Sequence, residues 1–198
     1  MDNKQEFIEL FKKHIKREGA DKLLNYLEKT DFFTAPASTE FHGSYEGGLV
    51  EHSINAFHCL KDYLQREAVA LCYGLKFTEE TMAVVALLHD ICMVDCYEIA
   101  YRNQQDENTG DWSKVPYYKF NEKIPFGHGE KSFFIISQFI KLNRNEAMAI
   151  RFHMGFSRKE DNPSDVGSAF EKYPLSFALS TADMEATYFV DGKKPNTK

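Results

Sequence analysis

The stretch from Met82 to Asp90 constrains the fold more than any other part of the chain. Every residue between Met82 and Leu88 is apolar, which predicts a buried helix, because an exposed helix would show a polar face. A histidine and an aspartate, His89 and Asp90, follow at its end. Burying either polar group without a partner costs several kcal/mol. The helix therefore delivers one nitrogen and one carboxylate, two potential metal ligands, into the interior.

The His89-Asp90 pair alone admits a second interpretation, because a histidine at a helix C-terminus also interacts favourably with the helix dipole. Further ligand-type residues, however, fall on or beside the apolar face of other predicted helices. Each of them alone is more often a satisfied polar group of the core. Together they predict a cation in the interior, because helical bundles build metal sites from inward-facing side chains. The six candidate ligands are His52, His89, Asp90, His128, His153 and Asp183.

The composition is that of a folded, acidic protein. The 198 residues suffice for one domain with a substantial core, and 43% hydrophobic with 27% charged residues excludes a disordered chain. The net charge of -6 argues against binding of bulk duplex DNA. The charged N-terminal segment has no apolar signal-peptide region, and no apolar run is long enough for a bilayer. We therefore expect a cytoplasmic protein without membrane contact.

Apolar residues recur mostly at helical spacing, so we expect a mainly α fold, a helical bundle in one domain over residues 1–198. Residues 1–46 are expected to hold two helices and a loop, residues 156–172 a polar loop, and residues 191–198 a frayed tail. The predicted helices cover residues 2–17, 21–30, 49–73, 78–88, 128–140, 145–153 and 174–189.

Residues 97–121 change from helical spacing to alternation, which predicts a β-hairpin inserted into the helical domain. A polar segment, residues 106–111, is typical of its turn. Three aromatic side chains of this hairpin could stack on a nucleic-acid base, although such aromatics more often pin a hairpin onto the core. They are Trp112, Tyr117 and Tyr118.

The cysteines lie inside helical patterns and lack the spacing of a zinc ribbon. We interpret them as reduced thiols of the core. The less favoured interpretation places Cys92 and Cys96 beside the metal site. The four residues are Cys59, Cys72, Cys92 and Cys96.

Five short motifs follow one another between Gly47 and Asp183. Together, in this order, they resemble the HD-domain metal-dependent phosphohydrolases. The first is similar to the HD domain of bacterial exoribonucleases of the YhaM kind, and the two additional histidines resemble the two-metal branch of the superfamily. The motifs are Gly-Gly-Leu-Val-Glu-His at 47–52, Leu-Leu-His-Asp-Ile at 87–91, Phe-Gly-His-Gly-Glu at 126–130, Arg-Phe-His at 151–153 and Thr-Ala-Asp at 181–183.

The resemblance implies an HD-type bundle with one or two divalent ions. His128 and His153 would bind the second ion and share Asp90 as a bridge. His89 and Asp90 would be catalytic, with Asp90 orienting the attacking water or accepting its proton. Imidazole and carboxylate suit Mn, Fe, Co, Ni or Zn, and Mg less well. The first ion would be held by His52, His89, Asp90 and Asp183.

One position departs from the family's pattern. Many members carry a lysine three residues after the aspartate of the His-Asp pair, where it is thought to help near the phosphate. This chain has Met93 there. Each of the cations nominated in its place could instead be a solvated surface charge. The nominated cations are Lys131, Arg151 and Arg102, and the fourth candidate substrate-binding residue, His42, is expected to line the substrate entrance from the loop before His52.

We therefore expect a divalent-metal phosphohydrolase that cleaves a phosphomonoester or phosphodiester of a nucleotide or short oligonucleotide. The alternative is an HD-fold sensor that binds metal or nucleotide with little or no turnover, which the absent lysine favours. A metal-free interaction domain would leave the buried polar groups unexplained. The sequence leaves open the substrate, the number and identity of the ions, and whether the chain forms a homodimer.

Overall fold

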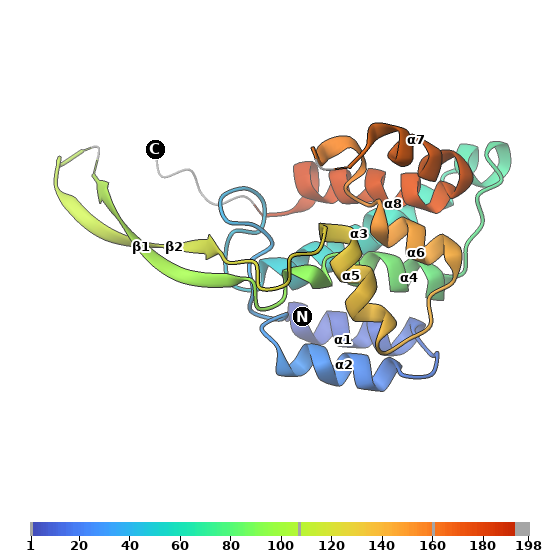
Figure 1. Ribbon diagram of the computed structural model, residues 1–198, viewed down its shortest axis with the longest axis horizontal. Helices are drawn as coiled ribbons and strands as arrows, with labels where there is room; N and C mark the ends of the chain where they lie inside the picture. The colour runs from blue at the N-terminus through green and yellow to red at the C-terminus, as the bar shows by residue number, and fades with distance from the viewer. Residues whose placement is uncertain (1, 107, 160, 193–198) are drawn as a thin grey trace.

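The computed structural model describes residues 2–106, 108–159 and 161–192. Within these ranges the chain is mainly helical and carries a two-stranded antiparallel sheet (Figure 1). This confirms the predicted mainly α fold with a small hairpin. None of the described helices is long and apolar enough to cross a membrane.

The helices predicted to begin near residues 2, 21, 49, 78, 128, 145 and 174 are all present. Their bounds, with one further helix, are α1 Asn3–His14, α2 Ala20–Lys29, α3 Gly48–Gln65, α4 Glu79–Leu88, α5 His128–Ser137, α6 Arg144–Arg151, α7 Pro163–Lys172 and α8 Pro174–Glu185. Short π-helical turns span Ala68–Cys72 and Ala186–Val190, and 3-10 turns span Ile91–Met93 and Gly155–Ser157. The strands are β1 Tyr97–Gln105 and β2 Trp112–Phe120.

Helix α4 forms the centre of the helical body. It packs against α1, α3, α6 and α8, and every residue from Met82 to Leu88 is buried. At its start the Thr78 hydroxyl accepts a hydrogen bond from the backbone N–H of Thr81, which satisfies a free amide of the first turn. Each fully buried aliphatic side chain contributes about 1.5–3 kcal/mol, so the helix is firmly held. His89 and Asp90 therefore follow a rigid element.

The loop between α2 and α3 folds tightly against the start of α3. The backbone N–H of Ala37 donates to the carbonyl of Gly43 at 2.9 Å. A Cβ atom on Gly48 would approach the Gly43 carbonyl oxygen to 1.9 Å, so any other residue at position 48 would displace the loop. This close approach places His42, which lies in the loop, beside the first turns of α3.

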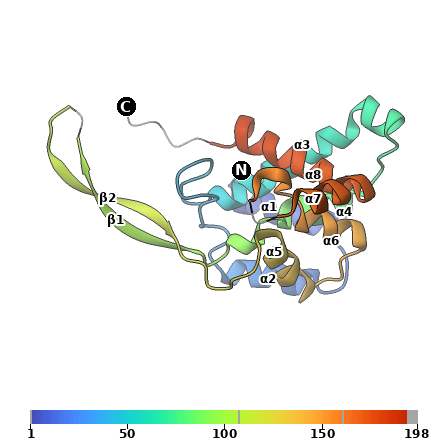
Figure 2. The same cartoon turned by 45° about the horizontal axis from the view of Figure 1, so that its top comes forward.

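The predicted hairpin is present. Its strands pair from Tyr97 opposite Phe120 to Gln105 opposite Trp112 and project from the helical body (Figures 1 and 2). We call residues 97–120 the arm. Trp112 lies at the far end of the arm and is 69% exposed. The interpretation that the aromatics pin the hairpin onto the core is therefore wrong for Trp112.

Two further expectations are wrong in part. The polar loop expected over residues 156–172 contains helix α7, which begins at Pro163 after the Asn162 side chain accepts the N–H of Ser164. Its apolar face is weak, because only Val166 and Ala169 are buried. The long helix expected over residues 49–73 ends at Gln65.

Candidate metal centre

Side chains from five parts of the fold converge beside the end of α4. Their ligand atoms form overlapping groups whose members lie within 4.8 Å of one another. The structure thus brings the six predicted ligands together, although they are widely separated in sequence. His52 comes from α3, His89 and Asp90 from the end of α4, His128 from the start of α5, His153 from just beyond α6, and Asp183 from α8.

One half of the cluster joins α3, α4 and α8. The Nε2 atom of His52 lies 3.0 Å from Nε2 of His89 and 3.2 Å from Oδ1 of Asp183. Nε2 of His89 lies 3.9 Å from the same Asp183 oxygen. Oδ2 of Asp90 is 3.7 Å from both of these imidazole nitrogens. Two imidazoles and two carboxylates therefore face one small volume.

The other half is arranged around the second oxygen of Asp90. This Oδ1 atom lies 2.8 Å from Nε2 of His128 and 3.1 Å from Nε2 of His153. The His153 ring is 4.8 Å from the His89 ring and 5.2 Å from the His128 ring, measured between centroids. Asp90 thus presents one oxygen to each half, as a carboxylate shared by two cations would.

Backbone carbonyls fix the tautomers of two of these histidines. Nδ1 of His89 donates to the carbonyl of Ala86 at 2.8 Å, and Nδ1 of His153 donates to the carbonyl of Ile150 at 2.7 Å. A carbonyl oxygen only accepts, so Nδ1 carries the proton in both rings. In the neutral rings Nε2 is therefore unprotonated and carries a free lone pair. This is the form in which imidazole binds a metal.

The arrangement fits a divalent cation. Nε2 of His153 is buried and has no hydrogen-bond partner, although Asp90 Oδ1 lies 3.1 Å away. A lone pair facing a carboxylate is repulsive unless a proton or a metal cation lies between them. The 3.0 Å separation of the Nε2 atoms of His52 and His89 also matches two nitrogens at right angles around an ion ~2.1 Å from each.

The pKa values of two histidines of the cluster, His89 and His52, are shifted in opposite directions. Burial lowers the pKa of His89 to about 4, so this imidazole stays neutral. Burial also acts to lower the pKa of His52, but hydrogen bonds to Asp183 and Asp191 outweigh it and raise the pKa well above 6.5. Burial would raise the pKa of Asp90, yet the surrounding imidazoles hold it well below 3.8. The carboxylate is therefore ionised and the cluster attracts positive charge.

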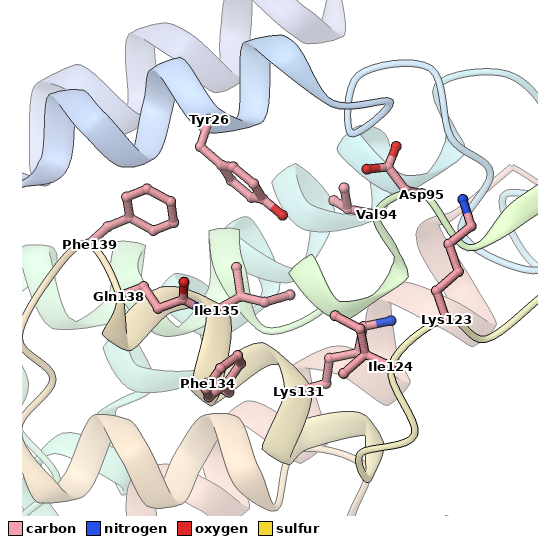
Figure 3. A pocket seen from close by; sticks show the side chains of 10 residues that line it. All are labelled: Tyr26, Val94, Asp95, Lys123, Ile124, Lys131, Phe134, Ile135, Gln138 and Phe139. Carbon is pink, nitrogen blue, oxygen red and sulfur yellow. The ribbon is translucent and has the colours of Figure 1, made fainter.

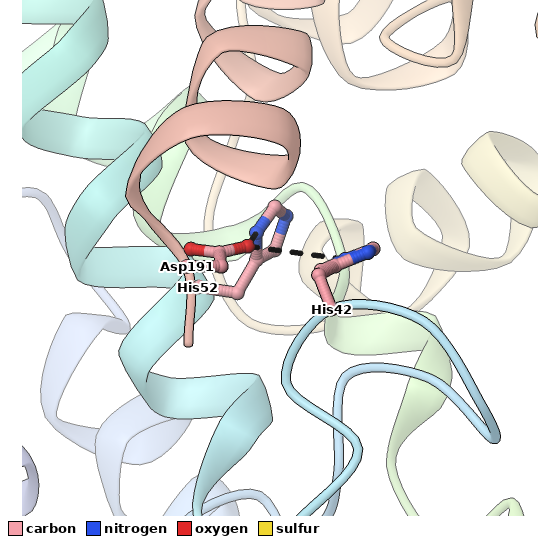
Figure 4. Close-up of side chains that lie close together, drawn as sticks. All are labelled: His42, His52 and Asp191. Atoms are coloured by element: carbon pink, nitrogen blue, oxygen red, sulfur yellow. Dashed lines mark hydrogen bonds and ion pairs between the residues drawn. The ribbon is translucent and has the colours of Figure 1, made fainter. Parts of the chain in front are cut away.

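Asp191 is a site residue that the sequence reasoning missed. The predicted frayed tail was expected to begin here, but Asp191 is buried, and its Oδ2 accepts the Nδ1–H of His52 at 2.8 Å (Figure 4). Its Oδ1 accepts from the side-chain amide of Asn55 at 2.9 Å. His42 approaches the same carboxylate, with 4.0 Å between its Nε2 and Oδ2. Asp191 thus orients His52, as partners of metal-binding histidines do.

Three of the cysteines are buried free thiols, as expected: Cys59, Cys92 and Cys96. The Cys72 side chain lies outside the described part of the structure. Cys92 lies beside the cluster, with its sulfur 3.4 Å from Nδ1 of His128. The less favoured interpretation, that these cysteines lie beside the metal site, therefore holds for Cys92. The sulfur of Cys96 instead contacts the Lys131 ammonium at 3.0 Å.

The predicted substrate-binding residues lie in different places. His42 alone borders the cluster, with its ring centroid 5.0 Å from that of His52. Lys131 is buried and binds Glu122 at 2.7 Å, so it neither faces the cluster nor is a solvated surface charge. Arg151 pairs with Glu130 and Asp161, and Arg102 lies on the arm, 3.7 Å from Glu40.

A cavity of about 420 Å³ lies on another side of α5 (Figure 3). Phe134, Phe139 and Tyr26 line its apolar part, and Asp95 and Lys123 border it. None of the six ligand candidates lines it. The cavity is therefore separate from the cluster.

Comparison with protein-family models, with curated proteins and with solved structures finds no match for this chain. The resemblance to the HD superfamily consequently rests on the motifs and on the buried histidine and aspartate cluster. The roles of the six residues as metal ligands stay a prediction.

Proposed function

We propose that this protein is a divalent-metal-dependent phosphohydrolase with an HD-type helical bundle. The observation that carries the proposal is the buried Nε2 lone pair of His153, which faces Asp90 without a hydrogen bond. A metal cation between the two groups would relieve this arrangement. Three further imidazoles and a second carboxylate complete the overlapping groups of the cluster, a donor set that suits first-row divalent ions better than Mg²⁺.

Divalent ions bound here would polarise phosphoryl oxygens and lower the pKa of a water molecule. Asp90, shared between the two halves, would orient a water molecule and accept its proton. His89 is held in its ligand tautomer by the carbonyl of Ala86. His52 is oriented by Asp191. Hydrogen bonds within the fold thus orient both imidazoles without any contribution from a metal.

The exposure of the cluster supports a small or single-stranded substrate. The His128 side chain is 23% exposed, Asp183 13% and Asp90 11%, whereas those of His52, His89 and His153 are at most 1% exposed. A phosphate group therefore has access from the side of His128, Asp90 and Asp183. Together with the acidic net charge, this favours a phosphomonoester or phosphodiester of a nucleotide or short oligonucleotide.

A second candidate function is a sensor with the same fold that binds metal or nucleotide with little turnover. It is favoured because position 93 is a methionine and not a lysine, and because none of the three nominated cations takes the lysine's place beside the cluster. Lys131 and Arg151 pair with carboxylates away from the cluster, and Arg102 lies on the arm. Turnover by the purified protein distinguishes the two functions.

The test is metal content together with hydrolysis of bis(p-nitrophenyl) phosphate and p-nitrophenyl phosphate by Mn-, Fe-, Co- and Zn-loaded protein. Asp90→Ala should abolish turnover and lower the bound metal, and Asp95→Ala, an exposed aspartate of the same segment, should retain both. Wild-type metal binding without hydrolysis of any phosphate ester would support the sensor. Turnover that survives Asp90→Ala would contradict the mechanism.

A further inference from the structure

Lys131 is a buried cation that the proposed phosphohydrolase does not use. It is only 3% exposed, and a lysine is almost never buried to this degree unless its ammonium is paired. Its Nζ atom donates to Oε1 of Glu122 at 2.7 Å and to the sulfur of Cys96 at 3.0 Å. The ammonium is therefore held between a carboxylate and a thiol.

Cys96 is held in place from several directions. Its side chain is buried, and the sulfur lies 3.3 Å from the carbonyl oxygen of Cys92 and 3.4 Å from that of Val94. Its own carbonyl accepts the backbone N–H of Asn121 at 2.8 Å. The thiol hydrogen points toward the two carbonyls, because an ammonium only donates and needs a sulfur lone pair. The contact between the sulfur and the Lys131 ammonium is thus fixed by the fold, although the two residues are 35 positions apart.

The cavity beside α5 brings small solutes to this pair. Its volume is about 420 Å³, and Lys131 forms part of its wall (Figure 3). Val94 and Asp95, the two residues that precede Cys96, also line it. A small neutral oxidant such as hydrogen peroxide can therefore approach Lys131 and the segment that carries the thiol.

We propose that Cys96 and Lys131 form a covalent modification site, at which a peroxide links the cysteine sulfur to the lysine nitrogen as a reversible sulfenamide. A cysteine sulfenic acid condenses with a nearby nitrogen in this way. Reacting atoms about 3–3.5 Å apart are in a near-attack arrangement, and the 3.0 Å contact lies at that distance. The inference requires no metal and is independent of the phosphohydrolase proposed above.

The reaction balances in two steps. In the first, the Cys96 sulfur takes one oxygen from hydrogen peroxide, the O–O bond breaks, and water leaves, so the thiol becomes a sulfenic acid. In the second, the Lys131 nitrogen attacks the sulfenyl sulfur and the S–O bond breaks. The ammonium loses two protons, one to the departing oxygen, which leaves as water, and one to the carboxylate of Glu122. Dithiothreitol reverses the link, because it reduces the S–N bond to thiol and amine while it becomes a disulfide.

The pair is expected to react slowly at neutral pH. Burial raises the pKa of the Cys96 thiol, and the Lys131 ammonium offsets this only in part. Burial acts to lower the pKa of Lys131, but its hydrogen bonds to Cys96 and Glu122 outweigh it and raise the pKa. The thiolate is the form that peroxide oxidises, so the oxidation is carried out at about pH 9.

The link would join two segments that each supply a side chain to the metal centre. Cys96 follows Asp90 by way of the turn Ile91–Met93, and Lys131 lies one turn after His128 at the start of α5. Oxidation would therefore hold the segment after Asp90 and the helix that begins at His128 in one covalent unit.

The first test is mass spectrometry of the wild-type protein before and after peroxide treatment. The link removes two hydrogens, so the mass should fall by about 2 Da, and dithiothreitol should restore it. Trypsin should no longer cleave after Lys131, and a cross-linked pair of peptides containing Cys96 and Lys131 should appear. A gain of about 16 or 32 Da at Cys96 with Lys131 unlinked would overturn the inference. A disulfide mapped to Cys92 and Cys96 would also overturn it.

The second test compares two lysines that line the same cavity. Lys131→Arg keeps a cation beside Glu122, but a guanidinium stays protonated and is not a nucleophile, so the cross-link should be lost. Lys123→Arg is the matched control and should retain it, because Lys123 is exposed at the rim of the cavity. Cys92→Ser should also retain the cross-link. A link that persists in Lys131→Arg, or that is lost equally in Lys123→Arg, would contradict the assignment.

The third test asks whether the fold creates the site. The wild-type protein is oxidised in parallel in buffer and in a concentration of urea that unfolds it. Unfolding separates the two side chains, so the yield of the cross-linked peptides should fall sharply in urea. An equal yield in both samples would show that the contact in the folded protein does not direct the reaction, and the inference would be wrong.

Discussion

The Nε2 atom of His153 lies 3.1 Å from Oδ1 of Asp90 without a hydrogen bond between them. The one hydrogen bond of this imidazole runs from Nδ1 to the carbonyl of Ile150, so removing the side chain removes a candidate ligand and a single hydrogen bond. We expect His153→Ala to weaken metal binding more than ~100-fold, because partners of ligands alone contribute ~10–100-fold. Elemental analysis after dialysis measures the loss. His58→Ala, an exposed histidine outside the cluster, should keep wild-type metal content.

Asp191 should control the metal affinity without contacting an ion itself. Its carboxylate orients His52, and Asp191→Ala should lower the affinity by ~10–100-fold, as measured by competition with a chelating dye. Asp191→Asn should retain part of the affinity, because the amide oxygen still accepts the Nδ1–H of His52. The exposed Asp62 provides the control, and Asp62→Ala should have no effect. An Asp191→Ala protein with unchanged affinity would show that the predicted positioning role is wrong.

Glu146 should be a major contributor to stability. It is fully buried and accepts hydrogen bonds from both terminal nitrogens of Arg17, at 2.9 and 3.0 Å, and from the Thr81 hydroxyl at 3.0 Å. Glu146→Ala would leave Arg17 without this carboxylate, at a cost of about 3–5 kcal/mol. For a chain of this size the melting temperature should fall by roughly 6–20 °C. Glu171→Ala, at an exposed position of α7, should change it little.

The pair formed by Glu122 and Lys131 should make stability depend on pH. Burial alone would raise the pKa of Glu122, but the hydrogen bond from Lys131 outweighs it, so the pKa lies below 4.5. A carboxylate with a lowered folded pKa stabilises the fold above its unfolded pKa, and this contribution disappears as the pH falls through the folded value. The unfolding free energy of the wild type should therefore decrease as the pH falls below about 4.5.

Glu122→Gln removes that contribution. The variant should be less stable than the wild type at pH 7 by about 1–3 kcal/mol, the value of a hydrogen bond to a charged group. Below pH 4 the two curves should approach each other, which urea unfolding at several pH values measures. Parallel curves would show that the pair does not titrate with folding. Glu171→Gln serves as the exposed control.

Periodicity predicted most of the helices because their apolar faces are strong. The run from Met82 to Leu88 and the stripe of α3 are buried as the pattern required. Helix α7 was missed because only Val166 and Ala169 are buried on it, too few to stand out from a loop. Its Asn162-Pro163 start was nevertheless a recognisable signal, since asparagine caps helices and proline favours their first position.

The candidate site was predicted in its ligand types but not in its supporting contacts. Six ligand candidates carry motifs and lie at helix ends or on apolar stripes, whereas Asp191 follows a helix in a polar segment without a pattern. Only the tertiary fold, which returns the chain to α3, brings Asp191 to His52. Lys131 was misjudged because spacing from His128 does not reveal that Glu122 and Cys96 lie beside it. A single sequence does not show which side chains of other segments lie beside a given residue.

His52 and Asp191 are 139 positions apart, so the ribosome synthesises them at different times. During translation the first histidine of the centre emerges long before its carboxylate partner exists, and Asp183 is also made late. Of the candidate ligands only Asp183 lies in α8, so the half of the centre around His52 lacks its second carboxylate until α8 has been synthesised. Because metal that binds only the folded protein stabilises it by mass action, loading should be the last event of maturation. The metal supply at that moment, more than the intrinsic selectivity of the donors, would decide which ion the protein carries.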